Sequence, residues 1–296
     1  MKIFITGASG FLGNSLGNFL LMDEANNIIP LVRKKDDSRG VYWDYEKREI
    51  ENGKLEGADV FVHLAGENIS GRWTAEKKRK LRDSRIKGTK FLCEVLAELS
   101  SPPKVMLCAS GVGIYGDRGG EELTEESQTG EGFLADLGRD WESASSVLND
   151  KGVRVLHLRS GLVLSKKGGV LKKMLLPFKF GFGGALGSGK NYWSWISLVD
   201  WLRACEWCIK NEELSGPVNF VSPYAVTNNE FTKTLGKVLK RPTFMRVPVF
   251  ALKLIFGEMA EEALLASSRV VPKRLMDNGF RFSHPKLFEF LNQELS

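Results

Sequence analysis

The sequence predicts an α/β protein in which a parallel β-sheet carries helices on both faces, with a smaller, mostly helical region at the C-terminus. Three observations lead to this fold class. Short apolar runs of strand length alternate with amphipathic stretches of helix length. The first apolar run ends in a glycine-rich turn that leads directly into a helical pattern. Of 296 residues, 43% are hydrophobic and 26% charged, which suits a globular chain with a sizeable core.

The strand and helix patterns alternate along most of the chain. Strands are expected at 2–6, 27–32, 59–65, 104–109, 153–159 and 217–221. Helices are expected at 11–22, 76–99, 136–149, 198–210 and 228–239. Pro30 is awkward in the second strand, because proline lacks a ladder donor. Right-handed crossovers between parallel strands place the helices on both faces, giving a doubly wound sheet.

The composition changes near residue 165. From there to Lys190 the chain is rich in Gly and Lys, which indicates an excursion from the sheet towards a substrate. We expect residues 1–165 and 190–222 to form the sheet domain, and residues 166–189 and 223–296 to form a substrate or cap domain.

The net charge of +6 is compatible with nucleic acid, an anionic membrane or a phosphorylated ligand as partner. It is concentrated in KKRKLRDSRIK (77–87) and around Lys166–Lys173, and such runs are usually solvated faces. No RNA-binding or zinc-finger signature accompanies them. No apolar run is long enough to span a bilayer, and the first residues do not resemble a signal peptide. We therefore expect a cytoplasmic protein without a nucleic-acid or membrane partner.

Neither the cysteines nor the histidines predict a metal site. Cys205-x-x-Cys208 lies in an amphipathic helical pattern and has no second ligand pair, so packed thiols are favoured over redox or zinc chemistry. His63 and His157 alternate within strands, where a packed role is favoured over a catalytic one. His284 is expected in a solvated turn.

The glycine-rich turn carries the first functional prediction. Its G-x-x-G-x-x-G spacing follows a strand and opens a helix, as in dinucleotide-binding Rossmann domains. Glycine allows the tight turn, the close approach of a pyrophosphate and close helix–strand packing. The phosphates would lie at the helix N-terminus, which favours anions. The expected cofactor-binding residues here are Gly7, Gly10, Phe11, Leu12 and Gly13.

The end of the second strand predicts the choice of cofactor. NAD-specific sites usually place a carboxylate there for the ribose 2′-hydroxyl, about 20 residues beyond the glycines. This chain has Arg33-Lys34-Lys35 and no acid before Asp36. Since an Arg fork binds a 2′-phosphate, NADP (NADPH) is favoured over NAD, although an exposed basic turn is the alternative.

The glycine turn and DVFVHLAG (59–66) resemble the extended short-chain dehydrogenase/reductase superfamily, which includes sugar-nucleotide epimerases. The closer likeness is to the epimerase-family subgroup with its own C-terminal domain, some members of which are labelled cell division inhibitors. It covers essentially the whole chain and rests on 63–73, 84–89, 175–196, 216–231 and 271–282. The resemblance implies an NADP-binding domain with further cofactor contacts from Leu64, Ala65, Gly66, Lys80, Arg85 and Val163, besides Arg33.

The superfamily's catalytic pair is missing from this chain. Its Tyr-x-x-x-Lys moves a proton while hydride passes to or from the nicotinamide. Alignment on Glu142 puts Leu134 and Gly138 at these positions, and the nearby Arg139 stays protonated. Relatives also tend to have His where this chain has Ser197.

Two polar residues remain as catalytic candidates. Ser110 ends the fourth strand, where the superfamily places a substrate-binding Ser, and Tyr115 is a candidate acid. The alternatives are a strand-end cap for Ser110 and a turn-closing role for Tyr115. Asn68 and Arg72, in the turn after the third strand, and Trp195, in an aromatic loop, are the expected substrate contacts, with core packing as the alternative for Trp195.

The favoured function is an NADP-dependent oxidoreductase or epimerase-like enzyme. Its substrate would be a small molecule such as a sugar or another carbonyl or hydroxyl compound. The alternative is an NADP(H)-binding regulator that acts through a protein partner, for example in cell division. An exposed apolar patch in Phe244–Phe256 would favour the regulator. The sequence leaves the oligomeric state open.

Overall fold

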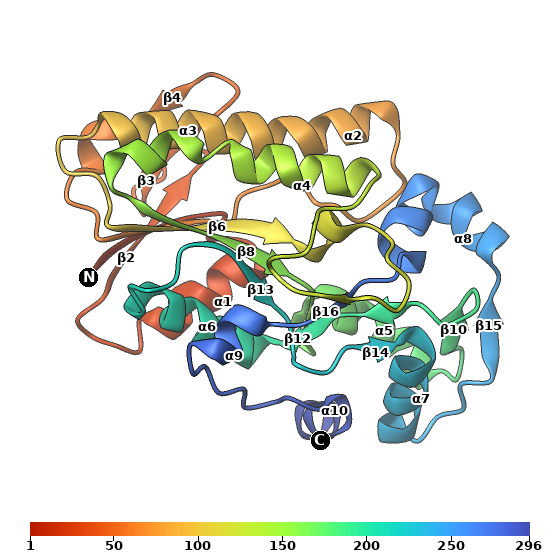
Figure 1. Ribbon diagram of the computed structural model, residues 1–296. Coiled ribbons are helices and arrows are strands. Elements are labelled where there is room, and N and C mark those ends of the chain that lie inside the picture. The colour runs from red at the N-terminus through yellow and green to blue at the C-terminus, as the bar shows by residue number, and fades with distance from the viewer.

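The computed structural model describes all residues, 1–296, and has an eight-stranded sheet at its centre (Figure 1). The strand order is β13-β8-β6-β5-β1-β2-β3-β4, and only the β3–β4 pair is antiparallel. The strands are β1 (Lys2–Thr6), β2 (Asn27–Val32), β3 (Val41–Asp44), β4 (Glu49–Ile50), β5 (Val60–His63), β6 (Val105–Gly111), β8 (Arg154–Ser160) and β13 (Gly216–Phe220). The order reverses between β1 and β5, and open sheets of this kind bind ligands at such a switch point.

Helices cover both faces of the sheet, as the alternating pattern predicts (Figure 1). On one face lie α2 (Ala75–Arg82), α3 (Gly88–Glu98) and α4 (Phe133–Ser143), and on the other α1 (Phe11–Leu20), α6 (Leu198–Lys210) and α9 (Lys273–Asp277). Each strand contributes side chains to two apolar cores, one on each face of the sheet, because successive side chains point to opposite faces. Ile3 and Ile5 pack towards α1 and α6, whereas Phe4 packs towards α3.

A second lobe packs at the carboxyl end of the sheet and has its own apolar core. It contains α5 (Gly169–Lys179), β10 (Gly184–Leu186), α7 (Asn228–Leu239), β15 (Met245–Val247), α8 (Val249–Phe256) and α10 (Leu287–Leu295). Trp193 and Trp195 contribute to this core although they fall in the segment expected to belong to the sheet domain. The domain boundaries therefore stay a prediction.

Short elements complete the chain. They are η1 (Asn52–Lys54), η3 (Val112–Tyr115), β7 (Glu122–Leu123), η4 (Ser146–Lys151), β9 (Leu162–Ser165), β11 (Tyr192–Trp193), β12 (Trp195–Ser197), β14 (Val226–Thr227), η5 (Ala260–Leu265) and β16 (Arg269–Val270). None of the helices combines the length and the apolar character needed to cross a bilayer.

The expected single helix at 76–99 is interrupted. A π-helical turn, η2 (Asp83–Lys87), joins α2 to α3. The stretch 165–190, expected to be an excursion from the sheet, contains the three-turn helix α5, with Pro177 inside it. Pro30 is accommodated in β2, whose outer neighbour β3 pairs with it only from Leu31 onwards.

Candidate functional site

The turn between β1 and α1 has the geometry that its glycines predict. Gly7 has φ +68°, and the Gly10 N–H donates to the Gly7 carbonyl at 2.9 Å. A Cβ on Gly7 would lie 2.9 Å from the backbone of Leu64, and one on Gly13 only 2.2 Å from the Gly7 oxygen. Side chains at these two positions would therefore force the turn open.

The N-terminus of α1 is not capped by a side chain. Gly10, at the N-cap, has extended backbone angles and no side-chain oxygen to accept from the first amides. The N–H groups of Phe11, Leu12 and Gly13 thus face outward at the positive end of the helix dipole, an arrangement that suits a phosphate. The Phe11 ring lies against Gly168, where a Cβ would come within 2.3 Å of it.

Buried hydrogen bonds hold the loop after β5 beside the glycine turn. Thr6 Oγ1 accepts from the Leu64 and Ala65 N–H groups, both at 3.1 Å, and lies 2.7 Å from His63 Nδ1. His63 Nε2 lies 3.1 Å from Thr89 Oγ1. Burial lowers the pKa of His63 to about 4, so at neutral pH the ring is uncharged. His63 is thus a packed residue that fixes the loop.

Arg85 reaches this loop from the π-helical turn. Its Nη1 donates to the Glu67 carbonyl at 3.0 Å, and its guanidinium lies over the Trp141 ring at 5.0 Å. Gly66 lies directly beside the guanidinium. Burial lowers the pKa of Arg85 to about 10, which still leaves it charged at neutral pH. Arg85 therefore lies beside the loop residues Leu64–Gly66, and its expected contact with a cofactor stays a prediction.

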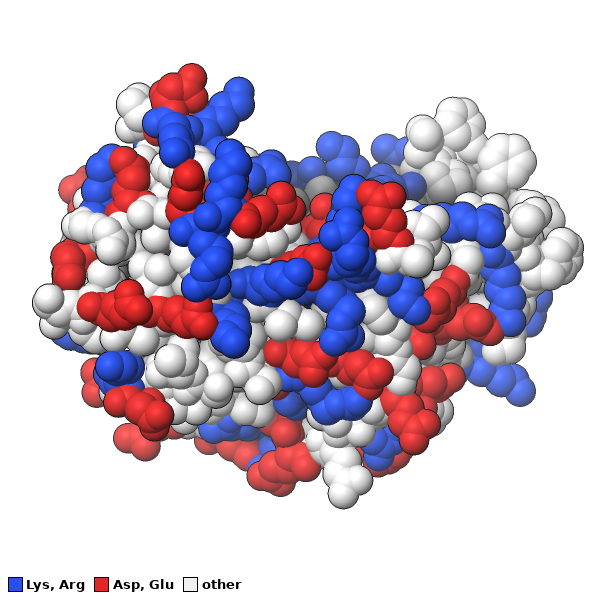
Figure 2. All heavy atoms as spheres, turned by 90° about the horizontal axis from the view of Figure 1, so that it is seen from above, with Lys and Arg blue, Asp and Glu red and all other residues white.

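Lys80 does not join this group. It forms an ion pair with Glu76 at 2.8 Å on the exposed side of α2, one turn back along the helix. The other exposed cations of the 77–87 run also have acidic partners, among them Glu67, Asp83, Asp140 and Glu258. Figure 2 shows these charges interspersed on the face formed by α2, α3 and α4. The run is a solvated, ion-paired surface.

Arg33 follows β2 directly and is exposed. Neither the Arg33 nor the Lys34 side chain forms an ion pair or a hydrogen bond, whereas Lys35 pairs with Glu49 at 2.7 Å. Of the two acids that follow, Asp37 is partly buried and paired with Arg39, and Asp36 is exposed. Two free cations thus directly follow β2, ahead of the first acid, where a Rossmann domain contacts the adenosine ribose.

The loop from Gly66 to Thr74 is tied to the second lobe. Arg72 Nη1 donates to the Leu254 carbonyl at 2.7 Å, and Lys173 Nζ donates to Ser70 Oγ at 3.2 Å. Asn68 is exposed, and its Oδ1 accepts from the Ser70 N–H. Arg72 and Asn68 therefore lie between the sheet and the second lobe. Val163, in β9, pairs in register with Ile196 of β12.

Trp195 requires a correction. The sequence suggested a substrate contact, but the side chain is completely buried in the core of the second lobe. Its ring stacks on Phe290 with centroids 5.6 Å apart, and its Nε1 donates to the Tyr224 carbonyl at 3.0 Å. A side chain without exposed surface or a free donor cannot contact a substrate in this structure.

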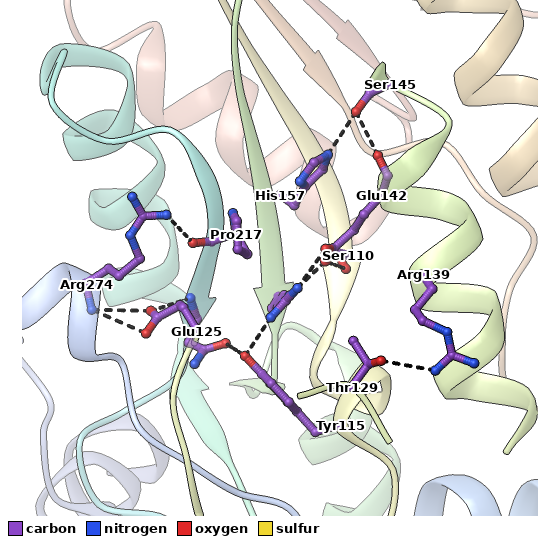
Figure 3. Close-up of polar contacts among 12 residues, drawn as sticks. Ser110, Tyr115, Glu125, Thr129, Arg139, Glu142, Ser145, His157, Pro217 and Arg274 are labelled. Carbon is purple, nitrogen blue, oxygen red and sulfur yellow. Dashed lines mark hydrogen bonds and ion pairs between the residues drawn. The ribbon is translucent and has the colours of Figure 1, made fainter. Parts of the chain in front are cut away.

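Ser110 belongs to a buried polar network at the carboxyl end of the sheet (Figure 3). Its Oγ donates to Glu142 Oε1 at 2.7 Å. Arg159 binds the same carboxylate through two hydrogen bonds of 2.8 Å, with the Arg and Glu side chains 7% and 12% exposed. Burial lowers the pKa of Arg159, but its bonds to Glu142 more than offset this and raise it. The pair is a fixed, bidentate ion pair.

Tyr115 lies behind this ion pair. Its hydroxyl accepts from Arg159 Nη1 at 2.9 Å and donates to Asn219 Oδ1 at 2.7 Å, and the side chain is fully buried. Burial raises its pKa, against the opposing effect of Arg159. The expectation that Tyr115 supplies the catalytic proton does not fit this geometry, because the hydroxyl has no path to a ligand.

The place of the superfamily's Tyr and Lys is filled by close packing. The 3₁₀ helix η3 packs against α4, so that a Cβ on Gly138 would lie 2.9 Å from Ile114 Cβ. A Cβ on Gly113 would lie 3.0 Å from Leu134 Cδ1. Glu262, from the second lobe, accepts from the Leu134 N–H at 3.1 Å. A lysine side chain at position 138 could not enter without displacing η3.

Sequence reasoning missed the partners in this network. Glu142 served only to align the missing pair, and Arg159 and Asn219 were not singled out. A charged residue alternating with apolar neighbours inside a predicted strand, as Arg159 does in RVLHLR, was the available signal that a buried partner exists.

The sheet order, the glycine turn and the uncapped helix together define a dinucleotide-binding protein of the extended short-chain dehydrogenase type. The "NAD dependent epimerase/dehydratase family" matches residues 3–136, and a "domain of unknown function (DUF1731)" matches residues 247–294. Epimerase family protein Mb2239 of Mycobacterium bovis is 39% identical over 291 residues, which cover 98% of this chain and 96% of the relative.

Human relatives match in sequence and in structure. Human epimerase family protein SDR39U1 is 32% identical over 291 residues, 97% of each chain. The crystal structure of its isoform 2 with NADPH aligns with a TM-score of 0.90 at 30% identity, covering 99% of both chains. The chain therefore belongs to the epimerase family with the C-terminal DUF1731 domain, and it has the NAD(P)-binding Rossmann fold of that family.

Proposed function

We propose that this protein binds NADP(H) in preference to NAD(H) and uses it to oxidise or reduce a small hydroxyl or carbonyl compound. The observation that carries the cofactor choice is the free Arg33–Lys34 pair directly after β2, ahead of the first acid, Asp36. Further support comes from the NADPH bound by the human relative. The regulatory alternative has the expected exposed apolar residues within 244–256 in its favour but no support from the comparisons, because none of these relatives is named as a cell division protein.

The residues present fit a dinucleotide. The uncapped amides of Phe11–Gly13 would bind the pyrophosphate, and Arg33 would bind the 2′-phosphate through its two-pronged guanidinium. Leu64–Gly66, fixed by Thr6 and Arg85, would line the path of the cofactor towards β6. The backbone at Val163 would flank the nicotinamide, which supplies the hydride chemistry when bound.

Ser110 is the proposed contact to the reacting oxygen. Its one hydrogen is donated to Glu142, so Oγ can offer only lone pairs to a ligand. A substrate hydroxyl would donate to Ser110, and its proton would pass through Ser110 to the Glu142 carboxylate as the carbinol carbon loses hydride. Arg159 and Tyr115 are positioning residues in this proposal, since they hold the carboxylate in place.

The cofactor part is tested by titrating the purified protein with NADPH and with NADH, followed by ligand fluorescence. Arg33→Ala is expected to weaken NADPH binding by about 10- to 100-fold and to leave NADH binding nearly unchanged. Lys35→Ala is the matched control, because that neighbouring cation is already paired with Glu49. Equal affinity of the wild-type protein for both nucleotides would contradict the proposal.

The catalytic part is tested by following NADPH oxidation with a panel of aldoses, ketones and aldehydes. Ser110→Ala is expected to bind NADPH as the wild-type protein does and to lose turnover by about 100-fold or more. Tyr115→Phe keeps the ring and removes the bond to Asn219. If Tyr115→Phe abolished turnover while Ser110→Ala did not, the assignment of the proton path would be wrong.

A further inference from the structure

Two segments of the second lobe concentrate the positive charge of the molecule. Residues 166–190 and 240–257 together hold ten Lys and Arg residues and no Asp or Glu. The other 253 residues hold 32 Lys and Arg against 36 Asp and Glu, so the net charge of +6 comes entirely from these two segments. All ten cations are exposed.

The same two segments expose an unusual amount of apolar surface. They contain nine of the 17 large hydrophobic residues that are exposed in the whole chain, each between 39% and 83% exposed. These nine are Leu176, Phe180, Phe182, Phe244, Met245, Val249, Phe250, Leu254 and Ile255. In Figure 2, uncharged atoms project from the molecule on the side where Figure 1 has α8. Large exposed apolar patches mark interaction sites.

The segments form one continuous surface, which we call the cationic apolar face. Strand β10 of the first segment pairs in parallel with β15 of the second. Arg241 Nε donates to the Lys179 carbonyl at 2.8 Å, and the Gly187 N–H donates to the Val247 carbonyl at 2.9 Å. Leu252 anchors α8 in the lobe, while its neighbours Phe250 and Leu254 project outward.

We propose that the cationic apolar face docks on an anionic lipid bilayer surface, with Phe250, Leu254 and their apolar neighbours inserted at the level of the headgroups. The combination favours this occupant because apolar insertion and attraction to anionic headgroups act together, and long Lys and Arg side chains reach headgroups beside inserted residues. The acids that follow the face, Glu258 and Glu261, are paired with Lys78 and Lys253 and add no free negative charge.

Charge argues against a second copy of the chain as occupant. A symmetric contact through this face would bring two sets of ten cations together, and of the ten only Lys253 has an acidic partner, Glu261. The sequence had suggested no membrane partner, but that expectation rested on the lack of a spanning segment, which interfacial docking does not need.

Flotation of the full chain with lipid vesicles tests the proposal. The wild-type protein should float with phosphatidylcholine vesicles that contain about 30 mol% phosphatidylglycerol, and far less with phosphatidylcholine alone. Phe250→Asp/Leu254→Asp should lower the bound fraction at least about tenfold, and so should Lys172→Glu/Lys179→Glu, which keeps the apolar residues. Failure of the wild-type protein to float with anionic vesicles, or equal binding to neutral ones, would overturn the proposal.

A matched control separates the face from a general effect of added charge. Leu21→Asp/Met22→Asp removes two exposed apolar residues and adds two acids after α1, and should float like the wild-type protein. Binding NADPH normally should be common to all these variants, so the test is independent of the proposed function. If sedimentation velocity showed a dimer that Phe250→Asp/Leu254→Asp dissolves, the face would be a self-association surface and the bilayer assignment would be wrong.

Discussion

The strand order of the sheet reverses between β1 and β5, and polar groups differ on the two sides of this point. On one side they lack partners in the protein, and on the other they are paired. At the β1–α1 turn three helix amides, and after β2 the cations Arg33 and Lys34, have no side-chain partner within the protein. At the end of β6, hydrogen bonds link Ser110 to Glu142, Glu142 to Arg159, and Arg159 to Tyr115. The glycine turn and the end of β2 therefore keep donors that a ligand can use. In the network at the end of β6, nearly all donors and acceptors are already paired within the protein.

The difference shows how a superfamily fold can keep its cofactor side while its catalytic side is rebuilt. The glycine turn needs only small residues and a helix end, and both are present. The catalytic side needs two long side chains on α4, where this chain instead has tight packing between Gly138 and Ile114. Chemistry at that end must then rely on hydrogen-bonding capacity that the network leaves unused, and Ser110 carries the proposal because its Oγ keeps free lone pairs.

The largest expected effect falls on the closed network. Arg159→Met leaves the Glu142 carboxylate buried without its counterion, which should lower the free energy of unfolding by about 3–5 kcal/mol. Glu142→Met/Arg159→Met removes both charges and should recover part of this loss. Urea denaturation measures both. If the loss of stability in the double variant equalled the sum of the losses in Arg159→Met and Glu142→Met, the two charges would not be coupled.

The next effect tests the open side. Gly13→Ala places a Cβ about 2.2 Å from the Gly7 oxygen and should weaken NADPH binding by at least about 100-fold, or about 3 kcal/mol. Gly17→Ala lies one turn further along α1, where the added methyl makes ordinary contacts of 3.7 Å, and is the control. Fluorescence titration of both variants decides whether the turn, and not the helix as a whole, requires glycine.

His63 couples the two sides, through Thr6 on one and Thr89 with Trp141 on the other. Its folded-state pKa of about 4 lies below the unfolded value of 6.5, so the unfolded chain binds a proton between these values that the folded protein does not. Stability should therefore fall as pH drops from 7 to 5, by about 2 kcal/mol from this group. His63→Gln should flatten that part of the urea-derived profile, and an unchanged slope would show that His63 does not cause it.

The smallest expected effect concerns Lys80, which the family resemblance placed at the cofactor. Its ion pair with Glu76 lies on an exposed helix surface and contributes about 0.5 kcal/mol or less. Lys80→Ala should change the NADPH dissociation constant by less than about twofold. A loss approaching that of Arg33→Ala would mean that Lys80 leaves Glu76 to reach the phosphates.

The open side could be predicted from the sequence because its signals are local. Gly7, Gly10 and Gly13 lie within one turn of chain, and Arg33 follows a strand whose place in the fold is fixed by that turn. On the closed side Ser110 was singled out, but its network with Glu142, Arg159 and Asn219 could not be predicted, because these residues come from four elements that meet only in the folded sheet. Trp195 was assigned to a loop by its surroundings, since nothing local reveals that Phe290 covers it. Likewise, the π-helical turn that directs Arg85 inward does not change the hydrophobic periodicity of the sequence, so residues 76–99 were expected to form one helix.

The packing of η3 against α4 also sets the direction in which this chain can change. Two substitutions, Leu134→Tyr and Gly138→Lys, would introduce the superfamily's catalytic pair. A lysine at 138 would overpack the contact with Ile114, so we expect that substitution alone to destabilise the protein. Engineering the Tyr-x-x-x-Lys chemistry into this chain would therefore have to begin by making room for the lysine beside η3.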